Sequence, residues 1–506
     1  MKNIIKVTLL LLLAGGVASC NLDKYPMGSA IDEEQAFTTV DDAKHFRDGI
    51  YYLARQCFSA YTVVPVNIQG EGINATTDYG NNYGFQYTWT FLDNDAVVEQ
   101  LWTYCYAAIY QINYFIEKGS AIRAGYDDID ETDTEAVNER NELDRYLGEA
   151  YLFRAMLYHQ LATFYCDDYD PATANEEHNG LILSVKADVN ARLERSSLFA
   201  TYERINTDLT EGRRLLTAAG VTEQEYYLSP EIADYLEAKV LLHTDQWTEA
   251  AAAAAAIADQ HPLITSSTDF INMWKNNSGS EILFQFFAST QEGRSNYGTV
   301  FLNDPYQQGL VIVPFYIPTR YMVNQYSSTD IRKKAYVDQR TANIGTGTYS
   351  INAVTKYPGN PNLNSTDAVN DLMQNVLVYR SADFHLMAAE AYARINDLAN
   401  ANKYLKNVVT ARDAEVEWED YTSIDAVFSA IKNERLKEMF MEGNRIADLK
   451  RWGDGMDRRG QEPQNESIVI ANGLDLYVPA DDYRFTWPIP QSEKNANPAI
   501  KNQTNW

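Results

Sequence analysis

The sequence is short of positive charge. Lys and Arg total 42 against 70 Asp and Glu, so the formal net charge is −28 at pH 7. Affinity for nucleic acids depends on cations that displace counterions from phosphates, so this composition excludes a general nucleic-acid role. The hydrophobic content of 45% excludes a disordered chain, because it supplies ample material for a buried core.

Cysteine is also scarce, with four residues in a chain of 506. One of them, Cys20, lies near the N-terminus, and the others are Cys57, Cys105 and Cys166. Three cysteines without paired spacing argue against a disulfide framework and against a cysteine-based zinc site. One disulfide is an open alternative, but buried free thiols are the expected state.

The sequence lacks the common catalytic motifs. GxSxG, HExxH, a Walker A loop and a GxGxxG that follows a strand are all absent, and the six His residues show no metal-ligand spacing. We therefore predict that the protein is not an enzyme, has no catalytic residues, and needs no metal or cofactor. A surface glycoside hydrolase stays open as an alternative, because 70 acidic residues make accidental carboxylate pairs inevitable.

The first 20 residues, MKNIIKVTLLLLLAGGVASC, are typical of a bacterial lipoprotein signal. Two lysines precede an apolar run at 7–14, which is shorter than the ~20 apolar residues of a membrane-crossing helix. Val17-Ala18-Ser19-Cys20 matches a lipobox and predicts removal of residues 1–19 and lipidation of Cys20, although a secretory signal before a chance cysteine is the alternative. Removal of the two lysines changes the formal charge from −28 to −28 − 2 = −30.

Long helical patterns dominate the rest of the chain. Apolar residues recur at spacings of three and four over the stretches at about 41–57, 98–118, 138–166, 199–219, 229–259, 379–396, 398–413 and 424–451. The short apolar runs 281–287 and 310–317 fit either strands or buried coil. The sequence therefore predicts a mainly α fold.

Two of these helical stretches repeat one pattern. Ala238, Leu241, Ala250, Ala254, Ile257 and Pro262 have the same separations as Ala389, Tyr392, Ala401, Leu405, Val408 and Asp413. Small residues at the first and third positions allow two antiparallel helices to approach closely, as in tetratricopeptide repeats. We predict a body of tetratricopeptide-like helical hairpins over about 30–59, 98–262 and 379–455, followed by a C-terminal segment at 456–506.

Segments 60–97 and 263–378 interrupt the helices and are rich in Gly, Asn, Tyr and Pro. We predict that together they form an irregular, loop-rich second lobe that binds ligand, because long irregular insertions usually carry function. Tyrosine is abundant, at 35 residues against 19 Phe and 8 Trp, and combines an apolar ring with a polar tip. The predicted ligand-binding residues are Asp78, Tyr79, Asn81, Asn82, Tyr83, Tyr87, Trp89, Tyr297, Tyr306 and Tyr316. Local loop packing is the alternative for each tyrosine.

Several motifs occur in the order of a known family. They are Leu22-Asp23-x-x-Pro26, Gly148-Glu149-Ala150 with Phe153-Arg154-Ala155, Val378-Tyr379-Arg380-Ser381-Ala382-Asp383, Glu434-Arg435 with Glu438, Glu442-Gly443-Asn444-Arg445, Arg451-Trp452-Gly453, and Trp487-Pro488-Ile489-Pro490. Over nearly the whole mature chain (20–506) the sequence resembles the SusD/RagB family of surface nutrient-binding lipoproteins. The charged residues at 434–445 are expected either to form ion pairs along one helix or to face solvent. In both cases they indicate the fold of the chain and not a catalytic site.

The resemblance implies a specific role. A lipid on Cys20 would anchor the protein to the outer membrane, facing the cell exterior. The irregular lobe would bind oligosaccharide and deliver it, without catalysis, to a SusC-like TonB-dependent transporter. Peptide ligands, as in RagB-type members, are the alternative within the family. A protein–protein adaptor that uses the repeat groove is a further alternative, outside this role.

Overall fold

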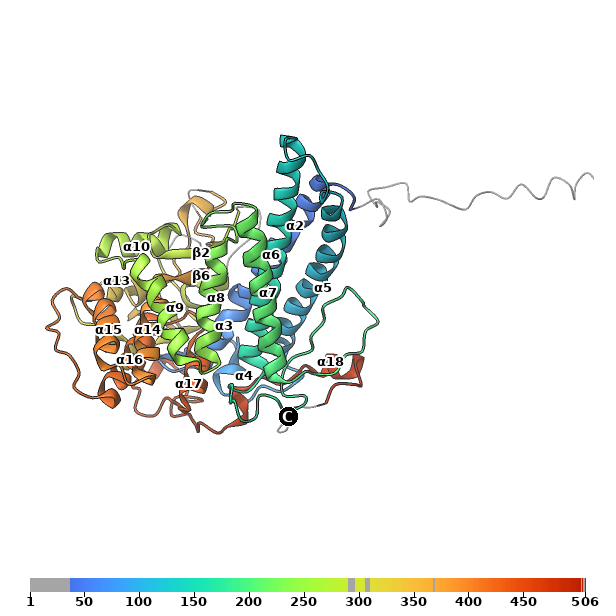
Figure 1. The fold of residues 1–506 in the computed structure, drawn as a ribbon. Coiled ribbons are helices and arrows are strands. Elements are labelled where there is room, and N and C mark those ends of the chain that lie inside the picture. Colours follow the sequence, from blue (N-terminus) through green and yellow to red (C-terminus); the bar gives the residue numbers. More distant parts are fainter. Residues whose placement is uncertain (1–36, 290–295, 305–309, 367–368, 502, 504–505) are drawn as a thin grey trace, which may run out of the picture.

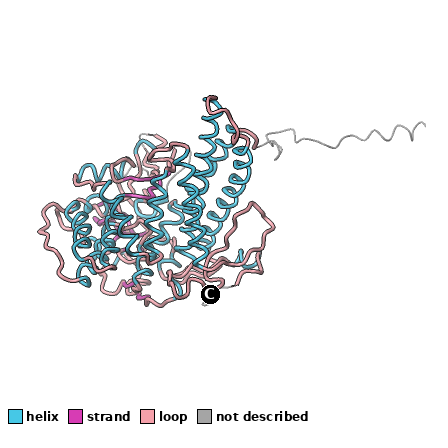
Figure 2. Tube along the Cα trace, viewed as in Figure 1, coloured by secondary structure: helices cyan, strands magenta, loops and turns pink. Residues whose placement is uncertain are grey.

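The computed structural model describes residues 37–289, 296–304, 310–366, 369–501, 503 and 506. Cys20 and Tyr306 lie outside these residues. Helices dominate and strands are few and short (Figure 2), which confirms the predicted fold class. Among the described residues, no helix has both the length and the apolar composition needed to cross a membrane.

The main helices form one curved array (Figure 1). They are α2 (Val40–Phe58), α5 (Ala96–Ala124), α6 (Thr134–Tyr165), α7 (Leu198–Ala218), α8 (Pro230–His243), α9 (Trp247–Gln260), α14 (Ser381–Arg394), α15 (Leu398–Arg412), α16 (Ile424–Glu438) and α17 (Arg445–Trp452). Most begin at a polar residue whose side chain accepts hydrogen bonds from the free backbone amides of the first turn. Thr39 and Asp42 form a capping box on α2, and the Asp133 side chain accepts hydrogen bonds from two backbone amides of α6.

The repeated pattern is confirmed as two stacked helical hairpins. Helices α8 and α9 form the first, α14 and α15 form the second, and α14 packs against α9 between them. The alanines at the predicted contact positions, Ala238, Ala250, Ala389 and Ala401, have no exposed surface. Because these side chains are small, neighbouring backbones can pack closely.

The segments between the helices contain short elements. Segment 60–97 carries α3 (Ala60–Gln69), β1 (Ile73–Ala75) and α4 (Gly84–Tyr87). Segment 263–378 carries α10 (Ser267–Asn276), β2 (Ile282–Phe286), α11 (Asn296–Leu302), β3 (Tyr316–Pro318), α12 (Arg320–Asn324), α13 (Arg332–Tyr336), β4 (Gln339–Ile344), β5 (Gly347–Asn352) and β6 (Val376–Arg380). Antiparallel pairing of β1 with β3 joins the two segments, while β2 pairs with β6 and β4 with β5.

The C-terminal segment is mostly irregular. It contains β7 (Met456–Asp457), β8 (Tyr477–Val478) and α18 (Gln491–Ala496), and β7 pairs with β8. A bridge between Thr76 and Val469 places it directly against segment 60–97.

The sequence left two short apolar runs open as strands or buried coil. The run 281–287 is largely a strand, β2, whereas only the end of the run 310–317 belongs to a strand, β3.

The prediction of a single helix over 424–451 was wrong. Helix α16 ends at Glu438, and α17 starts at Arg445 after a turn in which Met441 and Gly443 have positive φ angles of 62° and 82°. The turn interrupts the helix, so the charged residues on either side do not share one helical face. The suggestion of a solvated face was also wrong, because Glu434, Arg435 and Glu438 are buried.

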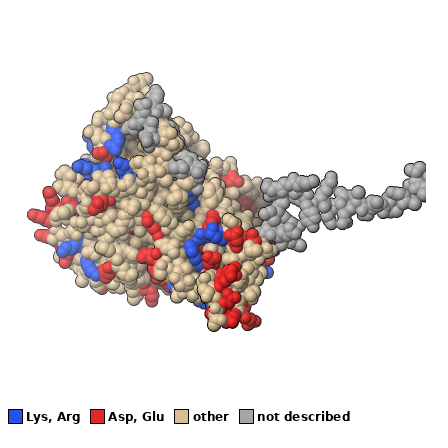
Figure 3. All heavy atoms as spheres, turned by 90° about the horizontal axis from the view of Figure 1, so that it is seen from above, with Lys and Arg blue, Asp and Glu red and all other residues tan. Residues whose placement is uncertain are grey.

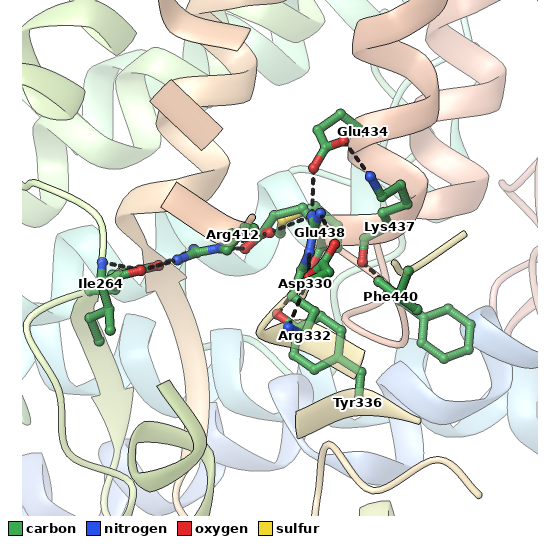
Figure 4. A network of polar contacts seen from close by, with 12 residues as sticks. Ile264, Asp330, Arg332, Tyr336, Arg412, Glu434, Lys437, Glu438 and Phe440 are labelled. Carbon is green, nitrogen blue, oxygen red and sulfur yellow. Dashed lines mark hydrogen bonds and ion pairs between the residues drawn. The ribbon is translucent and has the colours of Figure 1, made fainter. Parts of the chain in front are cut away.

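Glu438 lies at the centre of a buried ionic network (Figure 4). Its carboxylate accepts hydrogen bonds from Arg332 at 2.9 Å, Arg380 at 2.6 Å and Arg412 at 2.9 Å. Arg412 also donates to both oxygens of Glu281, at 2.7 and 2.8 Å. These residues come from α13, β6, α15, α16 and the residue before β2, so the network joins the helical hairpins to segment 263–378.

Removal of the central charge should destabilise the fold. We expect Glu438→Gln to lower the free energy of unfolding by about 3–5 kcal/mol, because it leaves buried guanidinium groups undercompensated. Burial alone would raise the pKa of Glu438, but Arg412, Arg380 and Arg332 outweigh it and hold that pKa well below its usual range. Urea unfolding at neutral pH measures the effect, with the exposed Glu249→Gln as control.

The same lowered pKa predicts acid sensitivity. The stabilisation is fully present above the pKa of an unfolded glutamate, about 4.3, and is lost progressively as pH falls below it. Urea unfolding between pH 5 and 3 should therefore show a smaller loss of stability in Glu438→Gln than in the unchanged protein. Equal slopes in the two proteins would contradict this role of Glu438.

Helices α6 and α7 meet at two glycines. A Cβ on Gly148 would lie 2.8 Å from Cγ of Leu216 and 3.0 Å from the Gly212 carbonyl oxygen. We expect Gly148→Ala to lower the free energy of unfolding by about 1–3 kcal/mol, because the helices must separate. Gly49→Ala is the matched control on α2, where a Cβ meets nothing within 4 Å; it should raise stability by about 0.5–1 kcal/mol. Thermal unfolding of both variants tests the contrast.

Candidate functional site

The loop that follows β1 presents five of the ten predicted ligand residues. Asn81 and Asn82 are exposed, and Asp78, Tyr79 and Tyr83 are half-buried. Gly80, Asn81 and Tyr83 all have positive φ angles, between 53° and 59°, which fold the chain tightly before α4. We call residues 77–85 the loop surface.

Polar contacts hold the loop surface in shape. Asp78 accepts a hydrogen bond at 2.7 Å from the backbone amide of Gly345, in the turn between β4 and β5. The Asn82 amide group donates to the Tyr79 carbonyl at 2.7 Å, and the Tyr79 hydroxyl donates to the Asn81 side chain at 3.2 Å. These amides already have loop partners, yet both asparagines are exposed, so they can also exchange hydrogen bonds with a ligand.

Aromatic rings accompany these amides. Phe85 is 52% exposed, and Tyr61 on α3, 42% exposed, lies near the phenol of Tyr83. Burial raises the pKa of Tyr83 to about 12, so its hydroxyl stays protonated and can donate at neutral pH. Sequence reasoning missed Phe85, although it lies within the aromatic stretch 78–89, and missed Tyr61, whose exposure depends on how α3 packs.

Four of the predicted ligand residues are buried instead. Tyr87, Trp89 and Tyr316 have no exposed surface, and Tyr297 is 5% exposed. Their rings therefore offer no face to a ligand in this structure, which corrects the sequence-based prediction at these positions. Tyr316 supports the loop surface: its hydroxyl donates to the Asn82 carbonyl at 2.6 Å, and its ring packs edge-on against Tyr87 and Tyr79.

Contacts with the C-terminal segment help to bury Tyr87 and Trp89. Arg458 donates to the Tyr87 carbonyl at 2.7 Å, and its guanidinium lies 4.2 Å from the centre of the Tyr87 ring. The indole N–H of Trp89 donates to the Gln69 carbonyl at 2.9 Å, while Phe485 packs against the indole. The segment that covers these rings lies more than 300 residues away in sequence, so no local pattern could reveal it.

A second feature is a cavity of about 130 Å³ with mixed polar and apolar walls, lined by residues of α6, α8, β6, α16 and α17. Tyr297 is part of its lining. The ring nitrogen Nε2 of His159 and the side-chain oxygen of Gln374 have no hydrogen-bond partner there among the described residues. Burial lowers the pKa of His159 to about 3, so the imidazole is neutral at physiological pH.

The cavity is a poor match for an extended ligand. Its charged side chains pair with each other, as Asp383 does with Lys239 at 2.5 Å and with Arg435 at 3.0 Å. Pockets that enclose drug-sized ligands have volumes of roughly 300–1,000 Å³, well above this one. No group of three or more His, Cys, Asp or Glu side chains in the described ranges is arranged to hold a metal ion. The loop surface is therefore the stronger candidate.

Comparison with known proteins places the chain in a family. A model of the SusD family matches residues 322–506, and a second model, described as starch-binding and associating with the outer membrane, matches residues 48–238. The chain belongs to the SusD family. A SusD-like protein from Formosa agariphila is 23% identical over 451 residues, which cover 80% of this chain and 78% of the relative.

Solved structures show the same SusD fold. A SusD superfamily protein from Bacteroides thetaiotaomicron matches with a TM-score of 0.73 and 22% identity, over 92% of this chain and 99% of that one. A putative sugar-binding protein from Bacteroides vulgatus matches with a TM-score of 0.71 and 20% identity, over 93% and 100% of the two chains. Several residues of the family motifs form buried ion pairs in this structure: Arg435 of α16 pairs with Asp383 of α14 and with Asp448 of α17.

The support from Tyr316 can be tested. Tyr316→Phe removes the hydroxyl that holds the Asn82 carbonyl, and we expect the free energy of unfolding to fall by about 1 kcal/mol. Hydrogen exchange of the amides in 79–85 should become faster while exchange in α8 and α9 stays unchanged. Tyr421→Phe, in the loop between α15 and α16, is the control and should alter neither the free energy of unfolding nor the exchange of the amides in 79–85. Unchanged exchange in 79–85 would show that Tyr316 does not hold the loop.

Proposed function

We propose that the protein is a surface lipoprotein that binds oligosaccharides at the loop surface and passes them to a SusC-like TonB-dependent transporter. The observation that carries this proposal is the loop surface itself, where exposed aromatic and amide side chains stand on a buried, rigid base. Sugar rings stack their C–H groups on aromatic faces, and their hydroxyls exchange hydrogen bonds with amides and carboxylates.

The charge of the site supports a neutral ligand. Segment 60–97 contains no Lys or Arg, so the loop surface offers no cation of its own to an anionic ligand. Acidic side chains gather in places on a largely uncharged face of the molecule (Figure 3), consistent with the net charge of −28. Polyanionic glycans would therefore meet a repulsive field.

The matching relatives point the same way. One matching family model is described as starch-binding and outer-membrane-associated, and one matching structure as a putative sugar-binding protein. Together with the lipobox, they support a protein held on the outer membrane by a lipid on Cys20, facing outward. The stacked helical hairpins would supply the rigid surface that docks on the transporter, and segments 60–97 and 263–378 would form the ligand-binding lobe.

Calorimetry with neutral hexasaccharides of glucose, xylose and mannose tests the proposal. We expect at least one to bind, and Tyr83→Ala and Phe85→Ala to weaken that binding about tenfold or more, equivalent to about 1.4 kcal/mol. Tyr421→Ala removes a ring of similar exposure, 37%, on a distant loop and should leave affinity unchanged.

Other outcomes would identify the alternatives. Binding of a hexapeptide library without binding of any glycan would replace the glycan with a peptide ligand. New reducing ends after incubation with the glycans would reveal a hydrolase rather than a binding protein. Co-purification with a periplasmic chain but no transporter would indicate an adaptor.

A further inference from the structure

The hairpin formed by β4 and β5 lies directly beside the loop surface. Its turn supplies the backbone amide of Gly345, which donates to the Asp78 carboxylate at 2.7 Å. A Cβ on Gly345 would lie 3.6 Å from the hydroxyl oxygen of Thr77, the first residue of the loop surface. The hairpin and the loop surface therefore meet at this turn.

The two strands of the hairpin have one buried face and one exposed face. Ala342, Ile344 and Ile351 are buried, and the exposed side chains lie on the other face because successive residues of a strand point to opposite sides. Strand pairing places Thr341 opposite Ser350, and Asn343 opposite Thr348. The exposed side chains, which we call the hairpin surface, are those of Gln339, Thr341, Asn343, Thr348 and Ser350.

The hairpin surface is polar but uncharged. Each of its side chains carries a hydroxyl or an amide, although 22% of all residues in the chain are charged. Exposed strands usually carry charged side chains, which prevent edge-to-edge aggregation. The Thr348 hydroxyl donates to the Asn343 side chain at 2.7 Å, whereas the side chains of Gln339, Thr341 and Ser350 have no hydrogen-bond partner among the described residues. Their polar groups are available to a ligand.

We propose that the hairpin surface binds the continuation of the same neutral oligosaccharide that the loop surface holds, so that the site recognises a chain of several sugars. This inference rests on the proposed function and adds a requirement for ligand length. Hydroxyls and amides both donate and accept hydrogen bonds, as sugar hydroxyls do. Because the hairpin surface is uncharged, contact with a neutral glycan requires no charge to be desolvated.

The geometry of a strand suits a repeating ligand. Outward side chains recur about every 6.8 Å along a strand, so they offer polar groups at regular intervals. From the turn to Gln339 the hairpin extends about 20 Å, or six residues at about 3.4 Å each. A short glycan on the rings of the loop surface leaves most of this length uncovered, whereas a longer chain can contact both surfaces. The site should therefore favour longer chains.

Calorimetry with glycans of two lengths tests this inference. For glucose, xylose and mannose, the trisaccharide is compared with the hexasaccharide of the same sugar. We expect a hexasaccharide to bind about tenfold more tightly than its trisaccharide. The double variant Thr341→Ala/Ser350→Ala should weaken hexasaccharide binding about fivefold, because it removes two hydroxyl donors, and leave trisaccharide affinity unchanged. Thr217→Ala removes an exposed hydroxyl from α7 and is the control, which should change neither affinity.

Hydrogen exchange of the unchanged protein gives a second readout that does not depend on a variant. The hexasaccharide should slow exchange of the backbone amides in 79–85 and in 339–352, whereas the trisaccharide should slow only those in 79–85. Slower exchange confined to 79–85 with both lengths would overturn the inference, as would equal affinities for the two lengths.

These outcomes are separable from a failure of the proposed function. Either of the two contrary results above leaves glycan binding at the loop surface intact. Absence of binding by every glycan would instead overturn the proposed function, and the role of the hairpin surface with it. Slower exchange in 339–352 with hexapeptides and with no glycan would also overturn both.

Discussion

The structure depends on the compensation of charges that water cannot reach. Three arginines from three different elements converge on the carboxylate of Glu438, and one of them, Arg412, also binds Glu281 in a bidentate pair. A guanidinium group has five donors in a fixed plane, so each arginine can satisfy several acceptors without solvent. Because the partners come from the helical hairpins and from segment 263–378, neither part can shift without leaving a buried charge unpaired.

This rigidity bears directly on the loop surface. Strand β3 pairs with β1, so the position of the loop that follows β1 is set by segment 263–378, which the ionic network holds. From the other side, Arg458 and Phe485 of the C-terminal segment hold Tyr87 and Trp89 in place. A short exposed loop thus keeps one shape. A preformed surface of this kind loses little conformational entropy when a ligand binds.

Particular residues show which features could be predicted from neighbouring sequence and which depend on contacts with distant parts of the chain. The helices of the hairpins could be predicted because their apolar spacing and capping residues lie within each helix, and the repeated alanines revealed their pairing. The turn at 439–444 could not, because Met441 and Gly443 interrupt a stretch whose spacing is otherwise helical. The loop surface was only partly predictable, since Tyr79 and Tyr83 have the same local composition as Tyr87 and Trp89.

The sequence by itself determined the mainly α fold, the stacked hairpins and the resemblance to the SusD family. Those features depend on periodicity and on motifs that are contiguous in the chain. Tertiary structure alone decided which rings face solvent and which charges pair. The reason is physical: burial and pairing depend on what packs against a residue, and here Asn82 and Tyr87 are held by Tyr316 and Arg458, which are distant in the sequence.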